Sequence, residues 1–120
     1  MVRDTISKEK LSQLLALGVD VVKADTSLPP ESPDSYNNIT PRLAKEMAHC
    51  YFPDQHNNRE NNEAHYYSTG PEIWEQMEGR IDYLVAGIGT GGTIGGIGRF
   101  MKEKDPKIRT IAVDIEGSVY

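Results

Sequence analysis

The residues best suited to chemistry form a glycine-rich segment in the last third of the chain, from Leu84 to Gly98. An apolar run ends in glycines and an amphipathic segment follows, which predicts a strand, a loop and a helix in that order. Glycines let the backbone turn with positive φ and bring N–H groups close together. The first helical turn adds unpaired N–H donors and a partial positive charge. We therefore predict a phosphate-binding loop, in which two threonine hydroxyls add hydrogen bonds. Its residues are Gly89, Thr90, Gly91, Gly92 and Thr93.

The residues alone leave three interpretations of this loop open. A nucleotide P-loop is excluded, because no lysine follows the glycines before Lys102. Gly87, Gly89 and Gly92 fit the dinucleotide-binding pattern G-x-G-x-x-G. Asp114, about 20 residues further on, stands where such a fold holds a ribose. The loop also suits a single phosphate monoester, such as that of pyridoxal phosphate. In the third interpretation it only packs a helix on a sheet and binds nothing.

Composition narrows the class of protein. The chain has 120 residues, 13 basic against 18 acidic, and a formal net charge of −5, which argues against nucleic acid as a partner. Its apolar runs are too short for a membrane span. Cys50 is the only cysteine, which favours a reducing cytoplasm. His65 has no second histidine or cysteine at ligand spacing, so no metal site is predicted.

The elements that must position the loop alternate along the chain. The pattern predicts helices between Ser7 and Gly18, from Thr40-Pro41 to Ala48, from Glu63 to Glu78 with a break at Gly70-Pro71, and from the glycine loop to Lys104, and strands at 19–22, 49–52, 84–88 and 108–113. This alternation is typical of an α/β fold, a parallel sheet with helices on both faces. The sheet should be incomplete at both ends, so we expect a segment of a larger enzyme.

Three glycines in the last predicted helix are a separate signal. Gly95, Gly96 and Gly98 each cost about 1 kcal/mol of helix propensity against alanine. Such a loss within two turns indicates that the helix closely approaches the sheet or a ligand.

Several segments in order carry a resemblance to a known family. They are Ser7 to Val22, Asp54-Gln55 with Asn57-Asn58, Ala64-His65-Tyr66, Thr69 to Trp74, Gly89 to Thr93, and Val113 to Ser118. Together they resemble the pyridoxal-phosphate β-replacement enzymes, the cysteine synthase and cystathionine β-synthase family of the tryptophan-synthase-β fold. Glu31 to Ser35 and Glu116 to Ser118 lean towards cystathionine β-synthase, of which the chain resembles an internal segment. Thr69 to Trp74 leans towards cysteine synthase.

The resemblance implies roles for individual residues. Residues 1–53 would end the smaller lobe of the enzyme, and 54–120 would begin the larger, phosphate-binding lobe. The glycine loop would hold the phosphate of pyridoxal 5′-phosphate, Gln55 would lie beside the substrate carboxylate, and Gly117 would line the cleft. His56 stands where relatives often carry an aromatic residue, and Pro41 falls inside a helix of the relatives.

The resemblance also implies an activity. It is a lyase reaction, the β-replacement of L-serine with homocysteine to give cystathionine in the transsulfuration route of cysteine biosynthesis. Small amino acids would be the substrates of a cytoplasmic homodimer. The alternatives are a cysteine synthase using O-acetylserine and sulfide, a nicotinamide-binding Rossmann half and an inactive fragment. No lysine here matches the family's Schiff-base motif, so the segment holds no catalytic residue and is predicted to be inactive alone.

Overall fold

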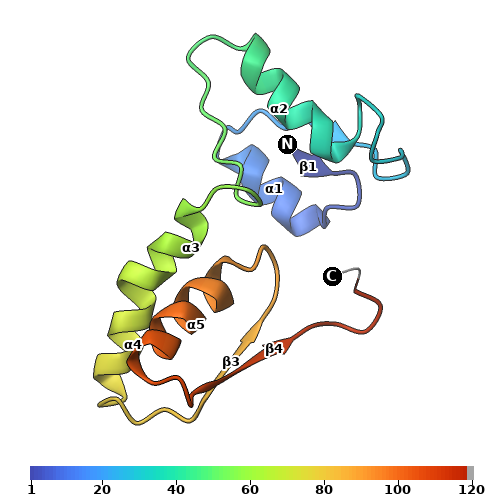
Figure 1. Cartoon of the computed structure of the whole chain (residues 1–120). Coiled ribbons are helices and arrows are strands. Elements are labelled where there is room, and N and C mark those ends of the chain that lie inside the picture. Colours follow the sequence, from blue (N-terminus) through green and yellow to red (C-terminus); the bar gives the residue numbers. More distant parts are fainter. Residues whose placement is uncertain (119–120) are drawn as a thin grey trace. The chain divides into compact units, whose positions relative to one another are not determined.

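The computed structural model describes residues 1–118, and the chain divides into two compact units, Met1–Phe52 and Pro53–Tyr120 (Figure 1). Each unit contains parallel strands and helices, in agreement with the predicted α/β class. The assignment of residues 1–53 and 54–120 to the two lobes of an enzyme stays a prediction. Among the helices within residues 1–118, none is long and apolar enough to cross a membrane.

The first unit is built on a very short parallel sheet. Its strands are β1 (Val2–Arg3) and β2 (Lys23–Ala24), and helix α1 (Lys8–Ala16) connects them. The predicted ends of α1 are confirmed. Ser7 caps the helix by accepting from the Lys10 N–H at 3.4 Å, and Gly18 follows its end with φ +74°. The predicted strand at 19–22 is wrong, because β1 offers only two residues to pair with and these face residues 23 and 24.

Helix α2 (Tyr36–Glu46) begins earlier than predicted. Its N-cap is Ser35, which is buried and donates its hydroxyl to the Pro30 carbonyl at 3.1 Å. The Asn38 amide donates to the same carbonyl at 2.8 Å. This anchoring of the proline-rich loop starts the helix ahead of Pro41, which therefore lies inside it, where the resemblance had placed it.

The predicted strand at 49–52 is absent from the described structure. His49 has a left-handed backbone with φ +58°, which interrupts an extended conformation, and Tyr51 is 79% exposed. The aromatic and apolar composition of this run is typical of a strand, but the run lies in irregular chain at the end of the first unit.

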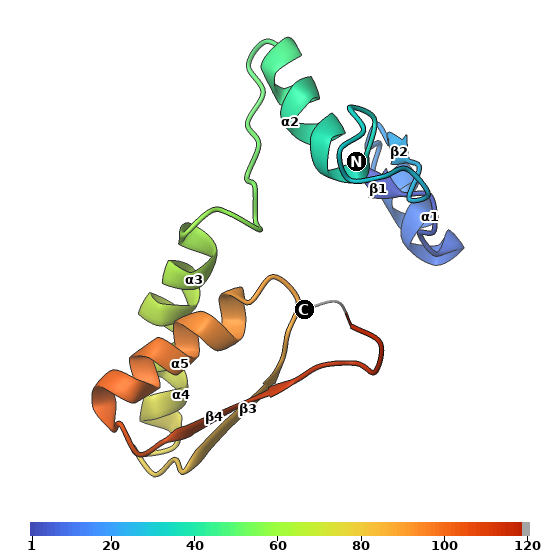
Figure 2. The same ribbon diagram turned by 45° about the vertical axis from the view of Figure 1, so that its right-hand side comes forward.

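The second unit carries the glycine loop between two paired strands. Strands β3 (Tyr83–Gly87) and β4 (Arg109–Val113) are parallel, and α5 (Gly92–Lys104) connects them, close to the predicted ranges. A long helical segment packs against α5 (Figure 2). It consists of α3 (Glu60–Ala64), the π-helical turn η1 (His65–Thr69) and α4 (Gly70–Gln76). The core between these layers is formed by Ile97, Met101 and Ile108, with Ile73, Trp74, Ile81, Leu84 and Phe100 around them.

Helices cover one face of the β3–β4 sheet within the described residues. The other face carries exposed apolar side chains, at Tyr83, Val85, Ile111 and Val113. Within residues 1–118, the predicted sheet with helices on both faces is thus represented by two separate two-stranded sheets.

The predicted break at Gly70-Pro71 takes the form of a widened turn. The helical segment continues through it, but the Gly70 N–H donates to the His65 carbonyl five residues back. Pro71 has no N–H and its ring crowds the preceding turn of an α-helix. The wider π-helical turn makes room for the ring without ending the helix, and such turns often lie at functional sites.

Candidate functional site

The glycine loop lies between β3 and α5 and offers a set of hydrogen-bond donors. Gly91 caps α5 with φ +81°, and the first amide to bond back along the helix is that of Gly95, to the Gly91 carbonyl at 2.9 Å. The N–H groups of residues 92 to 94 are thus left without a backbone acceptor in the described structure, as in any first helical turn. A Cβ built at Gly89 or Gly91 would meet nothing within 4 Å, so space for a ligand adjoins the backbone.

Among Gly89, Gly91 and Gly92, only Gly91 has a positive φ. At Gly92 the requirement is close packing instead. A Cβ there would collide with the side chain of Asn61, approaching its Nδ2 to 2.8 Å. Gly91 therefore allows the turn, and Gly92 allows the close contact with α3.

Asn61 connects the loop to the segment before α3. Its Nδ2 donates to Thr90 Oγ1 at 2.7 Å and to the Gln55 carbonyl at 2.8 Å. Because the Thr90 hydroxyl accepts this bond, its own proton remains available for a ligand. Thr90 is half-buried, which fixes the hydroxyl at the base of the loop.

His65 holds the second threonine of the loop. Its Nε2 lies 3.1 Å from Thr93 Oγ1, and its Nδ1 lies 3.0 Å from Thr69 Oγ1 in the same π-helical turn. Thr93 is exposed and stands on the first turn of α5, beside the free N–H groups. Both threonine hydroxyls are thus oriented by side chains of the neighbouring helical segment.

The glycines of α5 allow this segment to come close. A Cβ at Gly96 would lie 2.8 Å from His65 Cβ and 3.0 Å from the Tyr66 backbone nitrogen. At Gly98 a Cβ would meet Thr110 of the sheet at 3.4 Å, an ordinary contact. We predicted an approach to the sheet or to a ligand. The tightest approach is instead to the helical segment, because η1 packs directly on α5.

A charged cluster holds the same two helices together on the solvent side. The Arg99 guanidinium donates to both oxygens of Glu63 at 2.7 and 2.8 Å, and it lies 3.8 Å from the centre of the Tyr66 ring. This hydrogen-bonded pair lowers the pKa of Glu63 and raises that of Arg99. The Tyr66 hydroxyl donates to Glu103 at 2.5 Å, which raises the pKa of Tyr66.

Gln55 and Gly117 lie in exposed turns of the second unit. The Gln55 carbonyl is bound by Asn61, which also binds Thr90, so a single side chain connects its backbone to the glycine loop. Gly117 has φ +83° in the turn after β4. The register of the sheet pairs Gly87 with Val113, so this turn and the glycine loop leave the same sheet edge. The substrate-binding roles of Gln55 and Gly117 stay predictions.

Sequence reasoning missed Asn61, His65 and Thr69 as parts of the site. The signal was their spacing, since residues four apart lie on one face of a helix. The helix predicted to begin at Glu63 begins at Glu60 instead, so Asn61 lies inside it. No group of three or more metal-ligating side chains occurs in the part of the chain that the structure describes.

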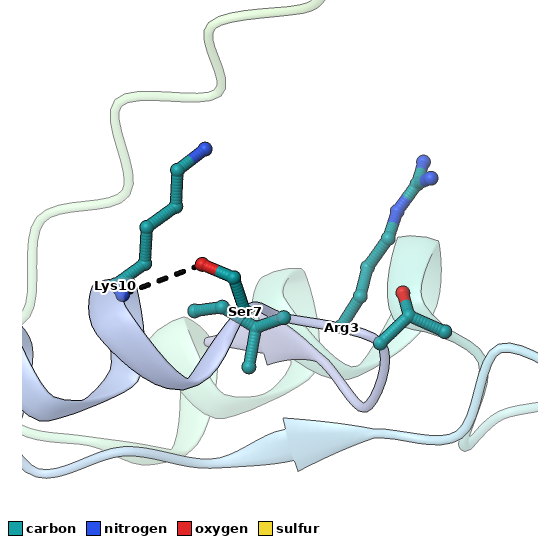
Figure 3. Close-up of a pocket in the computed structure, with 5 residues that line it drawn as sticks. Arg3, Ser7 and Lys10 are labelled. Atoms are coloured by element: carbon teal, nitrogen blue, oxygen red, sulfur yellow. Dashed lines mark hydrogen bonds between the residues drawn. The ribbon is translucent and has the colours of Figure 1, made fainter.

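A shallow depression in the first unit is separate from this site. It is lined by Arg3, Thr5, Ile6, Ser7 and Lys10. The side chains of Arg3 and Lys10 extend in the same direction on either side of Ser7 (Figure 3). Two surface cations at one helix start define no ligand, and we assign the depression no function.

Comparison with known proteins shows the family to which the chain belongs. The family described as pyridoxal-phosphate dependent enzyme matches residues 1–120. The chain belongs to this family. Its members depend on pyridoxal phosphate, so the dinucleotide interpretation, with Asp114 at a ribose, is set aside. The fold is that of the family, as the similarity to solved structures also shows.

Individual relatives include both cystathionine β-synthases and cysteine synthases. The chain is 47% identical over 116 residues to a cystathionine β-synthase of Apis mellifera, covering 97% of this chain and 23% of that protein. It is 42% identical over 119 residues to cysteine synthase 2 of Schizosaccharomyces pombe, covering 93% of this chain and 30% of that protein. It also resembles the crystal structure of an O-acetylserine-dependent cystathionine β-synthase from Helicobacter pylori, with TM-score 0.86 and 36% identity over 98% of this chain and 38% of that one. The chain thus spans between a fifth and two fifths of the length of these relatives.

The donors of the glycine loop fit the phosphate of pyridoxal phosphate. They comprise free N–H groups at the start of a 13-residue helix, two oriented hydroxyls and open space at Gly89 and Gly91. The positive end of the helix favours an anion there.

Proposed function

We propose that the complete protein catalyses the β-replacement of L-serine with homocysteine to give cystathionine, a lyase reaction of transsulfuration. The observation that carries this proposal is the 47% identity to a cystathionine β-synthase across 97% of the chain. In this reaction the Cβ–O bond of serine breaks and a Cβ–S bond to homocysteine forms. The serine hydroxyl leaves with the thiol proton as water. Pyridoxal phosphate supplies the electron sink for this exchange when bound.

The residues of this chain would bind and orient rather than transfer protons. Gly89 to Thr93 would hold the cofactor phosphate through backbone N–H groups and hydroxyls. The Gln55 amide would donate to the substrate carboxylate, and the bond from Asn61 to the Gln55 backbone carbonyl supports this role. Gly117 would line the cleft without a side chain. A Cβ there would meet no other atom within 4 Å and would occupy open space beside the chain. We further propose that residues 1–120 alone are inactive, because no lysine among them matches the Schiff-base motif.

A second candidate function is that of a cysteine synthase. It is favoured by the 42% identity to the S. pombe cysteine synthase and by the similarity to the H. pylori enzyme, which is O-acetylserine-dependent. This reaction exchanges acetate for sulfide at the same carbon. The two functions differ in the leaving group and in the incoming thiol.

One experiment separates the candidates. The complete protein, loaded with pyridoxal phosphate, is given L-serine or O-acetylserine with homocysteine or sulfide, and the products are identified by mass spectrometry. We expect cystathionine from serine and homocysteine as the fastest reaction. Cysteine from O-acetylserine and sulfide as the fastest reaction would establish the second candidate. Absence of cofactor uptake, with NAD binding in a parallel titration, would reject both.

Two further proposals concern the whole protein. We propose a cytoplasmic homodimer whose partners are small amino acids rather than nucleic acid or a membrane. Light scattering of the purified protein tests the dimer, and cell fractionation tests the location.

A further inference from the structure

The side chains of Thr69, His65 and Thr93 form a continuous hydrogen-bonded row that ends at the glycine loop. The distances are 3.0 Å from Thr69 Oγ1 to His65 Nδ1 and 3.1 Å from His65 Nε2 to Thr93 Oγ1. A neutral imidazole has one N–H donor and one bare nitrogen acceptor, so the row has a direction. That direction decides whether the proton of the Thr93 hydroxyl points towards the histidine or away from it.

Two arrangements are possible for a neutral ring. If Thr69 donates to Nδ1, the ring proton lies on Nε2 and is donated to Thr93, whose own proton then points outwards. If Nδ1 carries the proton, the bare Nε2 accepts a hydrogen bond from the Thr93 hydroxyl. That hydroxyl then offers an incoming phosphate only lone pairs. Only the first arrangement makes Thr93 a donor to an anion.

We propose that Thr69 is a positioning residue that, through the His65 tautomer, turns the Thr93 proton towards the cofactor phosphate. The inference rests on the proposed assignment of the loop to that phosphate. The neighbouring hydroxyl of Ser68 shows the usual alternative, because it donates to the Ala64 carbonyl at 2.6 Å. For Thr69 the corresponding carbonyl is that of His65, which already accepts the Gly70 N–H across the π-helical turn. The Thr69 hydroxyl instead lies 3.0 Å from the Nδ1 of the imidazole.

Three variants of the complete protein test the proposal. Thr69→Val removes the hydroxyl and keeps the shape, Thr69→Ser retains the hydroxyl, and Ser68→Ala removes a hydroxyl of the same turn that does not touch His65. The first readout is the Kd for pyridoxal phosphate, with inorganic phosphate as a competitor. We expect Thr69→Val to raise Kd roughly tenfold, the effect of about one hydrogen bond. Thr69→Ser and Ser68→Ala should stay close to wild type.

The second readout is the tautomer itself, from ¹⁵N NMR of histidine-labelled protein without cofactor. The His65 signals are assigned by their loss in His65→Gln. We expect a protonated Nε2 and a bare Nδ1 in the neutral wild-type ring, and a change of this pattern in Thr69→Val.

The outcomes distinguish the inference from the proposed function. A proton on Nδ1 of the neutral wild-type ring overturns the inference, whether or not the cofactor binds. So does an unchanged Kd in Thr69→Val, or an equal loss of affinity in Ser68→Ala. Failure of the wild-type protein to bind either phosphate probe, with the expected tautomer present, instead overturns the proposed function.

Discussion

Gly96 is the position at which a single methyl group most directly tests the geometry of the site. It is buried on α5, and an alanine Cβ there would lie 2.8 Å from His65 Cβ and 3.0 Å from the Tyr66 nitrogen. It would also collide with the Asn62 carbonyl oxygen. Two of these atoms belong to the backbone of the facing helix, so no change of rotamer relieves the contact. The helical segment must move away from α5.

The size of the movement follows from the distances. Carbon atoms in contact lie about 3.5–4.0 Å apart, so the segment must shift by roughly 1 Å. The bond from His65 to Thr93, now 3.1 Å, would lengthen to about 4 Å and be lost. Overpacking costs about 1–3 kcal/mol. Loss of the hydrogen bonds from His65 to Thr93 and from Asn61 to Thr90, which come from the same moving segment, costs about 0.5–1.5 kcal/mol each. The gain of about 1 kcal/mol in helix propensity offsets part of this. The net expectation is a destabilisation of about 1–5 kcal/mol.

Gly98→Ala is the matched control in the same helix. Its Cβ would meet Thr110 at 3.4–3.5 Å and Leu84 at 3.8 Å, which are ordinary contacts. The variant should be neutral or gain up to about 1 kcal/mol. Urea unfolding measures both variants in the complete protein, and titration with pyridoxal phosphate follows the loop. If Gly96→Ala were as stable as Gly98→Ala and bound the cofactor equally well, the inferred packing of η1 on α5 would be refuted.

Three other variants probe single contacts of the same region. Thr93→Val should weaken cofactor binding by about 1.5–3 kcal/mol, the worth of a hydrogen bond to a charged group, and unchanged affinity would make Thr93 only part of the helix start. Gln55→Ala should weaken amino-acid binding by roughly 1–3 kcal/mol with cofactor content near normal, whereas loss of cofactor with unchanged amino-acid affinity would show a structural role. Because the pKa of Glu63 is lowered in the folded state, its contribution to stability is present above its ordinary pKa of 4.5 and is lost as pH falls through the folded pKa. Acid titration of the urea midpoint should therefore show a smaller decline in Glu63→Gln than in wild type, and identical curves would contradict a role for the pair with Arg99.

Local sequence was enough to predict the second unit's central elements. The order of apolar run, glycines and amphipathic segment predicted β3, the loop and α5 within one or two residues, because each boundary has its own chemical signal. Gly91 turns the chain, and Lys102 and Lys104 stand in the last turn of α5, where cations are favourable. Such signals depend on residues close in sequence and do not require knowledge of the tertiary contacts.

The elements of the first unit were predicted less well, because their boundaries depend on distant partners. The strand β2 is limited by the two residues that β1 can pair with. The start of α2 is set by hydrogen bonds from Ser35 and Asn38 to Pro30, across the proline loop. Neither interaction is visible as a periodic pattern. Pro41 looked like a helix start by propensity alone, although the loop contacts had already started the helix.

The site escaped complete prediction for a related reason. The glycine loop was identified as if it bound phosphate by itself, yet its two hydroxyls are oriented from another helix. Asn61, His65 and Thr69 repeat every four residues and form one polar row, while Gly92 and Gly96 form a matching row without side chains on α5. The glycines leave the space that the polar side chains occupy, so neither row indicates the site without the other. The glycines lower the helix propensity of α5, and the π-helical turn departs from regular geometry. The low helix propensity and the irregular turn both occur where the two rows meet. There the polar row forms hydrogen bonds with the threonine hydroxyls of the loop.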